Sequence, residues 1–296
     1  MASKPALLGN VFATDLWAIR ADMSLEELTA KFAAAQEAAA AGAEVWAAPL
    51  PSTKDRVAVV PVEGVLTKNG PRWWGSNYNG ITKAVTDAAA DPDVSHIVLA
   101  VDSPGGEVGG CIEAASAIAA AAKQKPVTAM VDGMAASAAY WLTSQANSIV
   151  VTPSGSVGSV GIKTMHIDVS GALEQAGIKV TELQAGDHKT EWSRYKPLAP
   201  EAAAEVQQKM DTTHQQFITA VTQGRGGRAS RDIRIARFGE GRMFSAQQAI
   251  GNGLADKIQS AREFYASLLP AKPSVSKPGS LPYRLELDRA KVDMAL

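Results

Sequence analysis

The stretch HIVLAVDSPGG (96–106), followed by PVTAMVDGMAASAAYW (126–141), decides the fold. Each begins with a continuous apolar run of the kind that forms buried strands, at 96–102 and 126–132. An alanine-rich helical segment, CIEAASAIAAAAK (111–123), lies between them. A strand, a helix and a second strand in this order predict a β-α-β unit in a largely parallel, buried sheet.

The same alternation continues on both sides of this unit. Further strands are expected at VAVVPVEGVL (57–66), IVVT (149–152) and IKVTELQ (178–184), and a long helix from about residue 200 to 223. We therefore predict an α/β domain over residues 56–268. Residues 1–55 are expected to form a helical appendage and linker, because Ser24 and Glu27 have capping-box spacing before an alanine-rich run. The proline-containing residues 269–296 are expected to form a flexible tail.

Composition excludes several classes of protein. Lys and Arg number 29 against 30 Asp and Glu, so the basic surplus of a general nucleic-acid binder is missing. Cys111 is the only cysteine, which excludes an internal disulfide and a cysteine-based zinc site, and the four histidines lack metal-ligand spacing. There is no secretory signal and no apolar run of about 18 residues. We expect a soluble, intracellular protein without a membrane anchor.

Two loops at expected strand ends carry candidate chemistry, because active sites of parallel α/β folds lie at the carboxyl ends of strands. The first, Asp102–Gly106, has glycines that let backbone N–H groups face a ligand, although a plain turn explains it equally well. The second places Ser137 after a strand and a glycine, at the start of a helix. This arrangement resembles a nucleophile elbow without the GxSxG motif; the alternative is a serine that caps the helix.

A serine nucleophile needs a base, and three side chains are candidates: His166, His188 and Lys189. A lysine accepts a proton only where burial lowers its pKa, and a loop lysine is ordinarily solvated. The residues alone therefore leave the base open and indicate no more than a hydrolase.

Four motifs, taken in order, extend this interpretation. DSPGG (102–106), GMAASAAYW (133–141), GSVG (158–161) and GDHKT (186–190) resemble the signal peptide peptidase A family of Ser-Lys serine peptidases. The resemblance covers residues 57–258 and implies a ClpP/crotonase-like fold of repeated β-β-α units. By the match, Ser137 is the nucleophile, Lys189 the general base and Ser159 the residue that positions the lysine amine. The match also implies an oxyanion hole formed by the N–H groups of Gly106 and Ala138.

Within that family, the chain is most similar to the phage branch of capsid maturation proteases of the protein C type, on RVAVVPVEGVL (56–66), NYNGI (77–81) and GLADKI (253–258). This implies a serine endopeptidase that cleaves capsid, portal or scaffold proteins, without metal or cofactor, in the bacterial cytoplasm or the procapsid. It also implies a homo-oligomer that shares its site between subunits. Only a short tail follows the domain, so we expect no scaffold function on the same chain.

Three other interpretations stay open. The chain could be a soluble housekeeping relative of signal peptide peptidase, although a membrane anchor would then be expected. It could be a catalytically silent assembly component, against which Ser137 and Lys189 both argue. An acyl-CoA enzyme of crotonase type would explain neither residue. Trp73 and Trp74 could line a substrate groove or an oligomer contact, or pack in the core.

Overall fold

The computed structural model describes residues 17–19, 56–70 and 75–268 of the chain. The expected helix near residues 24–42, the two tryptophans Trp73 and Trp74, and the expected tail lie outside the described residues. Within the described part, strands and helices alternate as the sequence predicts, and the α/β class is confirmed.

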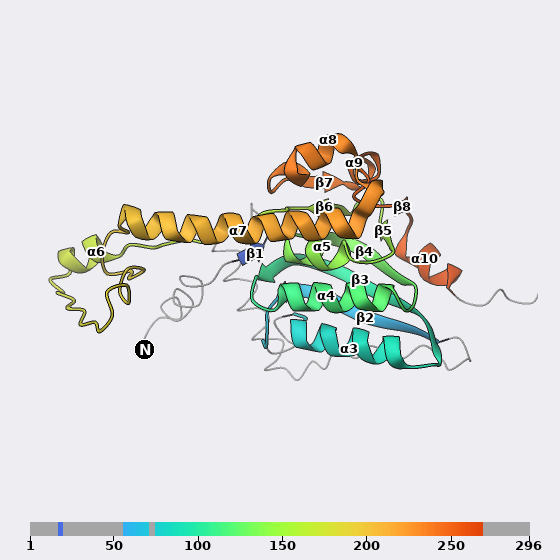
Figure 1. Ribbon diagram of the computed structural model, residues 1–296, viewed down its shortest axis with the longest axis horizontal. Coiled ribbons are helices and arrows are strands. Elements are labelled where there is room, and N and C mark those ends of the chain that lie inside the picture. The colour runs from blue at the N-terminus through green and yellow to red at the C-terminus, as the bar shows by residue number, and fades with distance from the viewer. Residues whose placement is uncertain (1–16, 20–55, 71–74, 269–296) are drawn as a thin grey trace, which may run out of the picture.

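One mostly parallel sheet forms the centre of the structure (Figure 1). β3 pairs in parallel with β2 and β4, and β4 pairs in parallel with β5 and β6. Only β1 and β7 pair antiparallel, with β3 and β6 respectively, among the described strands. The strands are β1 (Trp17–Ile19), β2 (Arg56–Leu66), β3 (Val94–Glu107), β4 (Val127–Ala136), β5 (Ser148–Val151), β6 (Ser156–Gly158), β7 (Met243–Ser245) and β8 (Lys257–Ile258).

Helices cover both faces of this sheet. Alternate strand residues separate the faces, since Ile97 and Leu99 join the large core cluster with the helices α3, α4 and α5. Val98 joins a smaller cluster with Phe264 of α10 on the opposite face. The helices are α3 (Tyr78–Ala90), α4 (Cys111–Ala122), α5 (Ala138–Thr143), α6 (Ser170–Gln175), α7 (Pro200–Arg225), α8 (Arg231–Ile235), α9 (Ala246–Asn252) and α10 (Ala261–Ser267).

The glycine run after residue 102 is not a turn. β3 continues through it to Glu107, so the expectation that the strand ends at Asp102 is wrong. The reason is tertiary: β2 runs beside the glycines and pairs Leu66 with Gly106. A Cβ on Gly106 would lie 1.8 Å from the Leu66 carbonyl oxygen, so only glycine lets the two backbones approach this closely.

A projecting arm, residues 165–199 with α6 at its end, extends away from the sheet beside the amino-terminal half of α7 (Figure 1). The strand predicted at 178–184 lies in this arm and is not formed. All seven side chains of 178–184 are exposed. A strand also needs a neighbouring strand to satisfy its backbone N–H and C=O groups. No such neighbour for it exists among the described residues.

The other end of α7 is fixed to the body of the domain. Phe217 stacks on Trp141 of α5 with ring centroids 4.4 Å apart. Arg225, whose side chain is 0% exposed, donates to both carboxylate oxygens of Asp256 at 2.7 and 3.0 Å and to the Gly253 carbonyl. Burial raises the pKa of Asp256, but the hydrogen bonds and charges of Arg225 outweigh burial and leave that pKa below its ordinary value.

We expect Arg225→Ala to lower the free energy of unfolding by about 3–5 kcal/mol, because it removes two charge-assisted hydrogen bonds from the Asp256 carboxylate. Asp256 would keep the Ile149 N–H at 2.7 Å and the more distant Arg228 guanidinium at 3.8 Å. Since the pKa of Asp256 is lower in the folded chain, this stabilisation is present above about pH 4 and is lost as pH falls through the folded value. Urea unfolding at pH 7 measures the effect. A loss below about 1 kcal/mol, the range of an exposed pair, would contradict it.

Candidate active site

Ser137 follows β4 directly and precedes α5, so the helix begins where the sequence predicts. The expectation that the strand ends at residue 132 is wrong, because β4 continues through Gly133 to Ala136. Its backbone has φ 54° and ψ −119°, a conformation that residues other than glycine rarely adopt. The Ser137 N–H donates to the Gly158 carbonyl at 2.8 Å. Strained backbone of this kind concentrates at functional sites and is typical of a serine on a sharp strand-to-helix turn.

The capping alternative for Ser137 is wrong. Its side chain makes no cap hydrogen bond to α5, and Oγ instead donates to the Gly161 carbonyl at 3.3 Å. Ser137 is 0% exposed, so a substrate carbonyl reaches Oγ only after a neighbouring segment moves.

Ser159 lies beside Ser137 and shares its backbone strain. It follows β6, whose Gly158 pairs with Ala136 of β4, and its own φ is 54°. Its N–H donates to the Arg242 carbonyl at 2.8 Å. The structure therefore brings the two serines of the second and third motifs to adjacent strand ends. The Gly161 carbonyl that receives the Ser137 hydroxyl belongs to the same GSVG motif, although sequence reasoning gave it no role.

The two expected oxyanion donors come from β3 and from the start of α5. Ala138 is the residue after Ser137 and is buried. β3 pairs with β4 up to Ser103 opposite Ala135, and Gly106 lies three residues further along β3. Ser137 lies two residues beyond Ala135, so Ala138 directly follows the nucleophile, whereas Gly106 lies on β3 beyond the last residue that pairs with β4.

Lys189 is not brought to Ser137 within this chain. It is exposed on the projecting arm, where its N–H donates to the Gly186 carbonyl at 3.2 Å. Figure 1 places the arm beyond the end of the sheet, away from α5. Within the described chain, Ser137 and Ser159 therefore lie together, whereas Lys189 lies apart from them on the arm.

Both candidate histidines are engaged within the arm as well. The ring of His166 donates from Nε2 to the Ser193 carbonyl at 2.9 Å and contacts Trp192 edge to face. His188 forms a hydrogen bond and ion pair with Glu191, which raises the pKa of its imidazole. Within the described residues, neither ring forms a hydrogen bond with Ser137.

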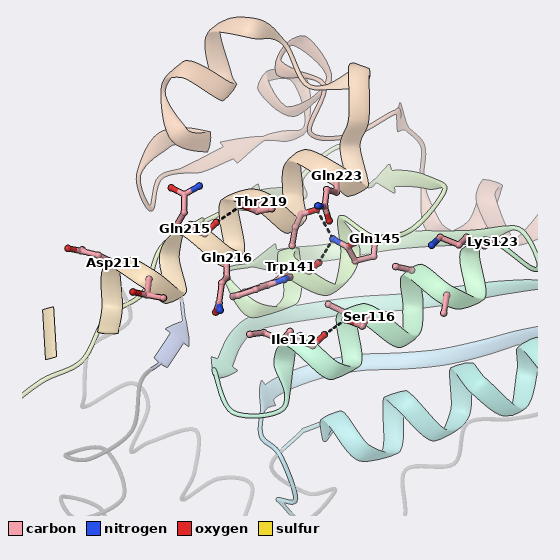
Figure 2. Close-up of a pocket in the computed structure, with 15 residues that line it drawn as sticks. Ile112, Ser116, Lys123, Trp141, Gln145, Asp211, Gln215, Gln216, Thr219 and Gln223 are labelled. Atoms are coloured by element: carbon pink, nitrogen blue, oxygen red, sulfur yellow. Dashed lines mark hydrogen bonds between the residues drawn. The ribbon is translucent and has the colours of Figure 1, made fainter. Parts of the chain in front are cut away.

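The hollow drawn in Figure 2 is separate from this site. It has a volume of about 910 Å³ and lies between α4, α5 and α7, with Ile112, Trp141 and Thr219 among its lining residues. Gln145 closes part of it by donating to the Ala220 carbonyl of α7 at 3.1 Å. Ser137 does not line this hollow, so the candidate site is a strand edge rather than this cavity.

A family model, "Peptidase family S49", matches residues 119–272 of the 296. This range includes Ser137, Ser159 and Lys189. The chain belongs to peptidase family S49. This membership favours a peptidase over the acyl-CoA alternative, and the chain has curated relatives among phage proteins.

Capsid assembly protease C of Escherichia phage lambda is 34% identical over 206 residues, covering 68% of this chain and 46% of the relative. Head-tail preconnector protein GP5 of Enterobacteria phage P21 is 31% identical over 230 residues, covering 76% of this chain and 45% of the relative. Protease 4 of Salmonella typhi is 35% identical over 185 residues, covering 62% of this chain and 29% of the relative. The chain thus spans less than half the length of these curated relatives.

Solved structures similar to this chain share little sequence with it. A variant of the 1510-N membrane-bound stomatin-specific protease, in complex with a substrate peptide, has a TM-score of 0.45 and 17% identity, covering 73% of this chain and 80% of that one. An enoyl-CoA hydratase/isomerase family member has a TM-score of 0.42 and 16% identity, covering 71% and 69%.

Two classes of feature are missing from the part of the chain that the structure describes. No helix there has the length and apolar character needed to cross a bilayer. No group of three or more His, Cys, Asp or Glu side chains in the same residues could hold a metal ion.

Proposed function

We propose that this chain is a serine endopeptidase of the Ser-Lys type that processes phage head proteins. The observation that carries the proposal is Ser137 at the end of β4, which has a strained backbone and a side chain that does not cap α5. It belongs to a chain of a peptidase family. The names of the lambda and P21 relatives support capsid, portal or scaffold proteins as substrates. The bacterial cytoplasm or the procapsid interior is the corresponding place of action.

The reaction uses the chain's own groups. Neutral Lys189 Nζ accepts the Ser137 proton while Oγ attacks the peptide carbonyl carbon, and the carbonyl electrons move to its oxygen. The N–H groups of Gly106 and Ala138 hold that oxyanion, and the loss of one such donor costs about 10²–10³ in rate. The oxyanion then collapses, the peptide C–N bond breaks, and Lys189 returns the proton to the leaving amine. Water releases the acyl group by the same steps, and Ser159 positions the lysine amine throughout.

The distance between arm and body leads to the second part of the proposal: Lys189 completes the site of a neighbouring subunit in a homo-oligomer. Among the described residues, five of the seven exposed large hydrophobic side chains lie in the arm, including Leu183 at 92% exposure. Exposed apolar groups gathered in one segment mark an interaction surface. The unpaired segment 178–184 would gain a partner strand there.

An interface of this kind also supplies what the chemistry requires. A lysine amine acts as a base at moderate pH only when desolvation favours its neutral form. On the isolated arm Lys189 is exposed to water. Docking of the arm against a neighbour would remove that water at the moment when the amine reaches Ser137. Assembly and activation would therefore be one event.

We expect the peptidase rate to rise from pH 7 to pH 9, because only the neutral amine of Lys189 accepts the serine proton. His166→Ala and His188→Ala should keep the alkaline rise and most of the rate, since both rings are engaged within the arm. The kcat/KM of a peptide substrate, measured against pH for all three chains, checks this. A plateau reached below pH 7, or an inactive His166→Ala chain, would indicate a histidine base.

The substrate proposal is tested with head proteins from the same phage or prophage genome. The purified chain is incubated with capsid, portal and scaffold proteins, with casein as the comparison, and new N-termini are mapped by mass spectrometry. We expect a few discrete cuts in one head protein. Cleavage of casein with intact head proteins would support the housekeeping alternative, and no cleavage of any protein would support the silent assembly component.

A further inference from the structure

β3 has two edges, and different strands occupy them near the candidate site. On one edge β2 pairs in parallel as far as Gly106. On the other edge β4 pairs as far as Ser103 opposite Ala135. β1 pairs antiparallel with Gly105–Glu107, and β2 already fills the first edge there. β1 therefore lies end to end with β4 on the same edge of β3 (Figure 1).

This position is next to the nucleophile. Ser137 comes two residues after Ala135, at the point where β4 leaves β3. The register of β1 places its last residue, Ile19, opposite Gly105, and its first residue, Trp17, opposite Glu107. The carboxyl end of β1 is consequently the end nearer to Ser137.

Addition of an extended peptide to an open sheet edge is a recurrent mode of peptide recognition, in which main-chain hydrogen bonds supply the affinity. A substrate bound with the polarity of β1 would lay the residues before its scissile bond along Gly105–Glu107. The following carbonyl would then reach the expected oxyanion donors and Ser137. β1 has the place and direction of that part of a substrate.

We infer that Trp17–Ile19 of the chain itself occupies the edge of β3 that receives the substrate, so that a substrate must displace β1 before it is cut. This rests on the proposed peptidase function. The competing ligand is an extended peptide held through its main chain. The full burial of Ser137 agrees with a site that is closed in this state.

The test uses full-length chains with a proline in β1. Neighbouring residues of an antiparallel ladder alternate between hydrogen-bonded and non-hydrogen-bonded pairs, so Ala18→Pro or Ile19→Pro removes a ladder hydrogen bond. Ala13→Pro, outside the described strand, is the control. Each change is made in a Ser137→Ala chain, and the probe is a fluorescent peptide of residues 12–23, FATDLWAIRADM.

We expect at least one β1 variant to bind the probe about tenfold more tightly than the control, the effect of roughly one hydrogen bond lost by the resident strand. In chains with Ser137 intact, the KM of an added peptide should fall by a similar factor at unchanged kcat. Equal probe affinities in all three chains, or an unchanged KM, would overturn the inference. If no chain cuts any peptide, the proposed function fails, whereas the difference in probe affinity still decides the occupancy of the edge.

Discussion

Ser137→Ala is expected to reduce kcat/KM for a peptide or head-protein substrate by at least about 10⁴-fold, the scale seen when a serine nucleophile is removed. The side chain supplies the attacking oxygen. The fold should survive, since among the described residues the Ser137 side chain makes a single hydrogen bond, the 3.3 Å contact with the Gly161 carbonyl. Its loss should cost about 1 kcal/mol in the free energy of unfolding.

Ser116→Ala is the matched control. It removes a serine hydroxyl from α4, where Oγ donates only to the Ile112 carbonyl of its own helix. Both variants should show native circular dichroism, and only the first should be inactive. If purified Ser137→Ala cleaved substrate at the rate of the control, the assignment of the nucleophile would be wrong.

Lys189→Ala should be as inactive as Ser137→Ala, because residues that act as one unit do not contribute additively. Lys179→Ala removes another exposed lysine of the same arm and should leave the rate nearly unchanged. The two inactive chains should restore activity when they are mixed under conditions of subunit exchange. In a closed ring with equal random mixing, roughly a quarter of the sites would combine an intact serine with an intact lysine.

Activity near that fraction would support a site shared between subunits. Exchange is verified by native mass spectrometry, which also gives the subunit number. Mixed oligomers without activity would place both residues of the dyad in one chain, and the arm would then have to fold back toward its own α5.

The sequence predicts the α/β sheet and the position of Ser137 well, because both depend on local pattern. Continuous apolar runs such as 96–102 and 126–132 become central strands with both faces covered. The glycine turn expected at Gly133 is not formed, because β4 continues through it to Ala136 and the chain turns at Ser137 itself. The positive φ angles of Ser137 and Ser159 could not be predicted from the sequence. The strained backbone is held by tertiary hydrogen bonds: the Ser137 N–H donates to the Gly158 carbonyl, and the Ser159 N–H donates to the Arg242 carbonyl. Each acceptor is distant in sequence from its donor.

Three features could not be predicted because they depend on partners. The glycines after Asp102 read as a turn, but pairing with β2 keeps them extended. Residues 178–184 read as a strand, yet within the described chain they have no neighbour to pair with. β1 is three residues long and carries too short a pattern to be recognised. Strand pairing is a property of two segments, whereas sequence pattern describes one.

The stacking of Phe217 on Trp141 fixes the direction in which α7 leaves the body of the domain. From Phe217 to Pro200 the helix extends about 26 Å at 1.5 Å per residue, and the arm lies beyond that end. A tilt of about 10° at the stacked rings would shift Pro200 by roughly 4–5 Å, more than the length of a hydrogen bond. A residue packed against the helix that Ser137 begins therefore sets the reach of a lysine far from it. A change of side-chain volume at Phe217 should therefore alter the position of the arm relative to the sheet.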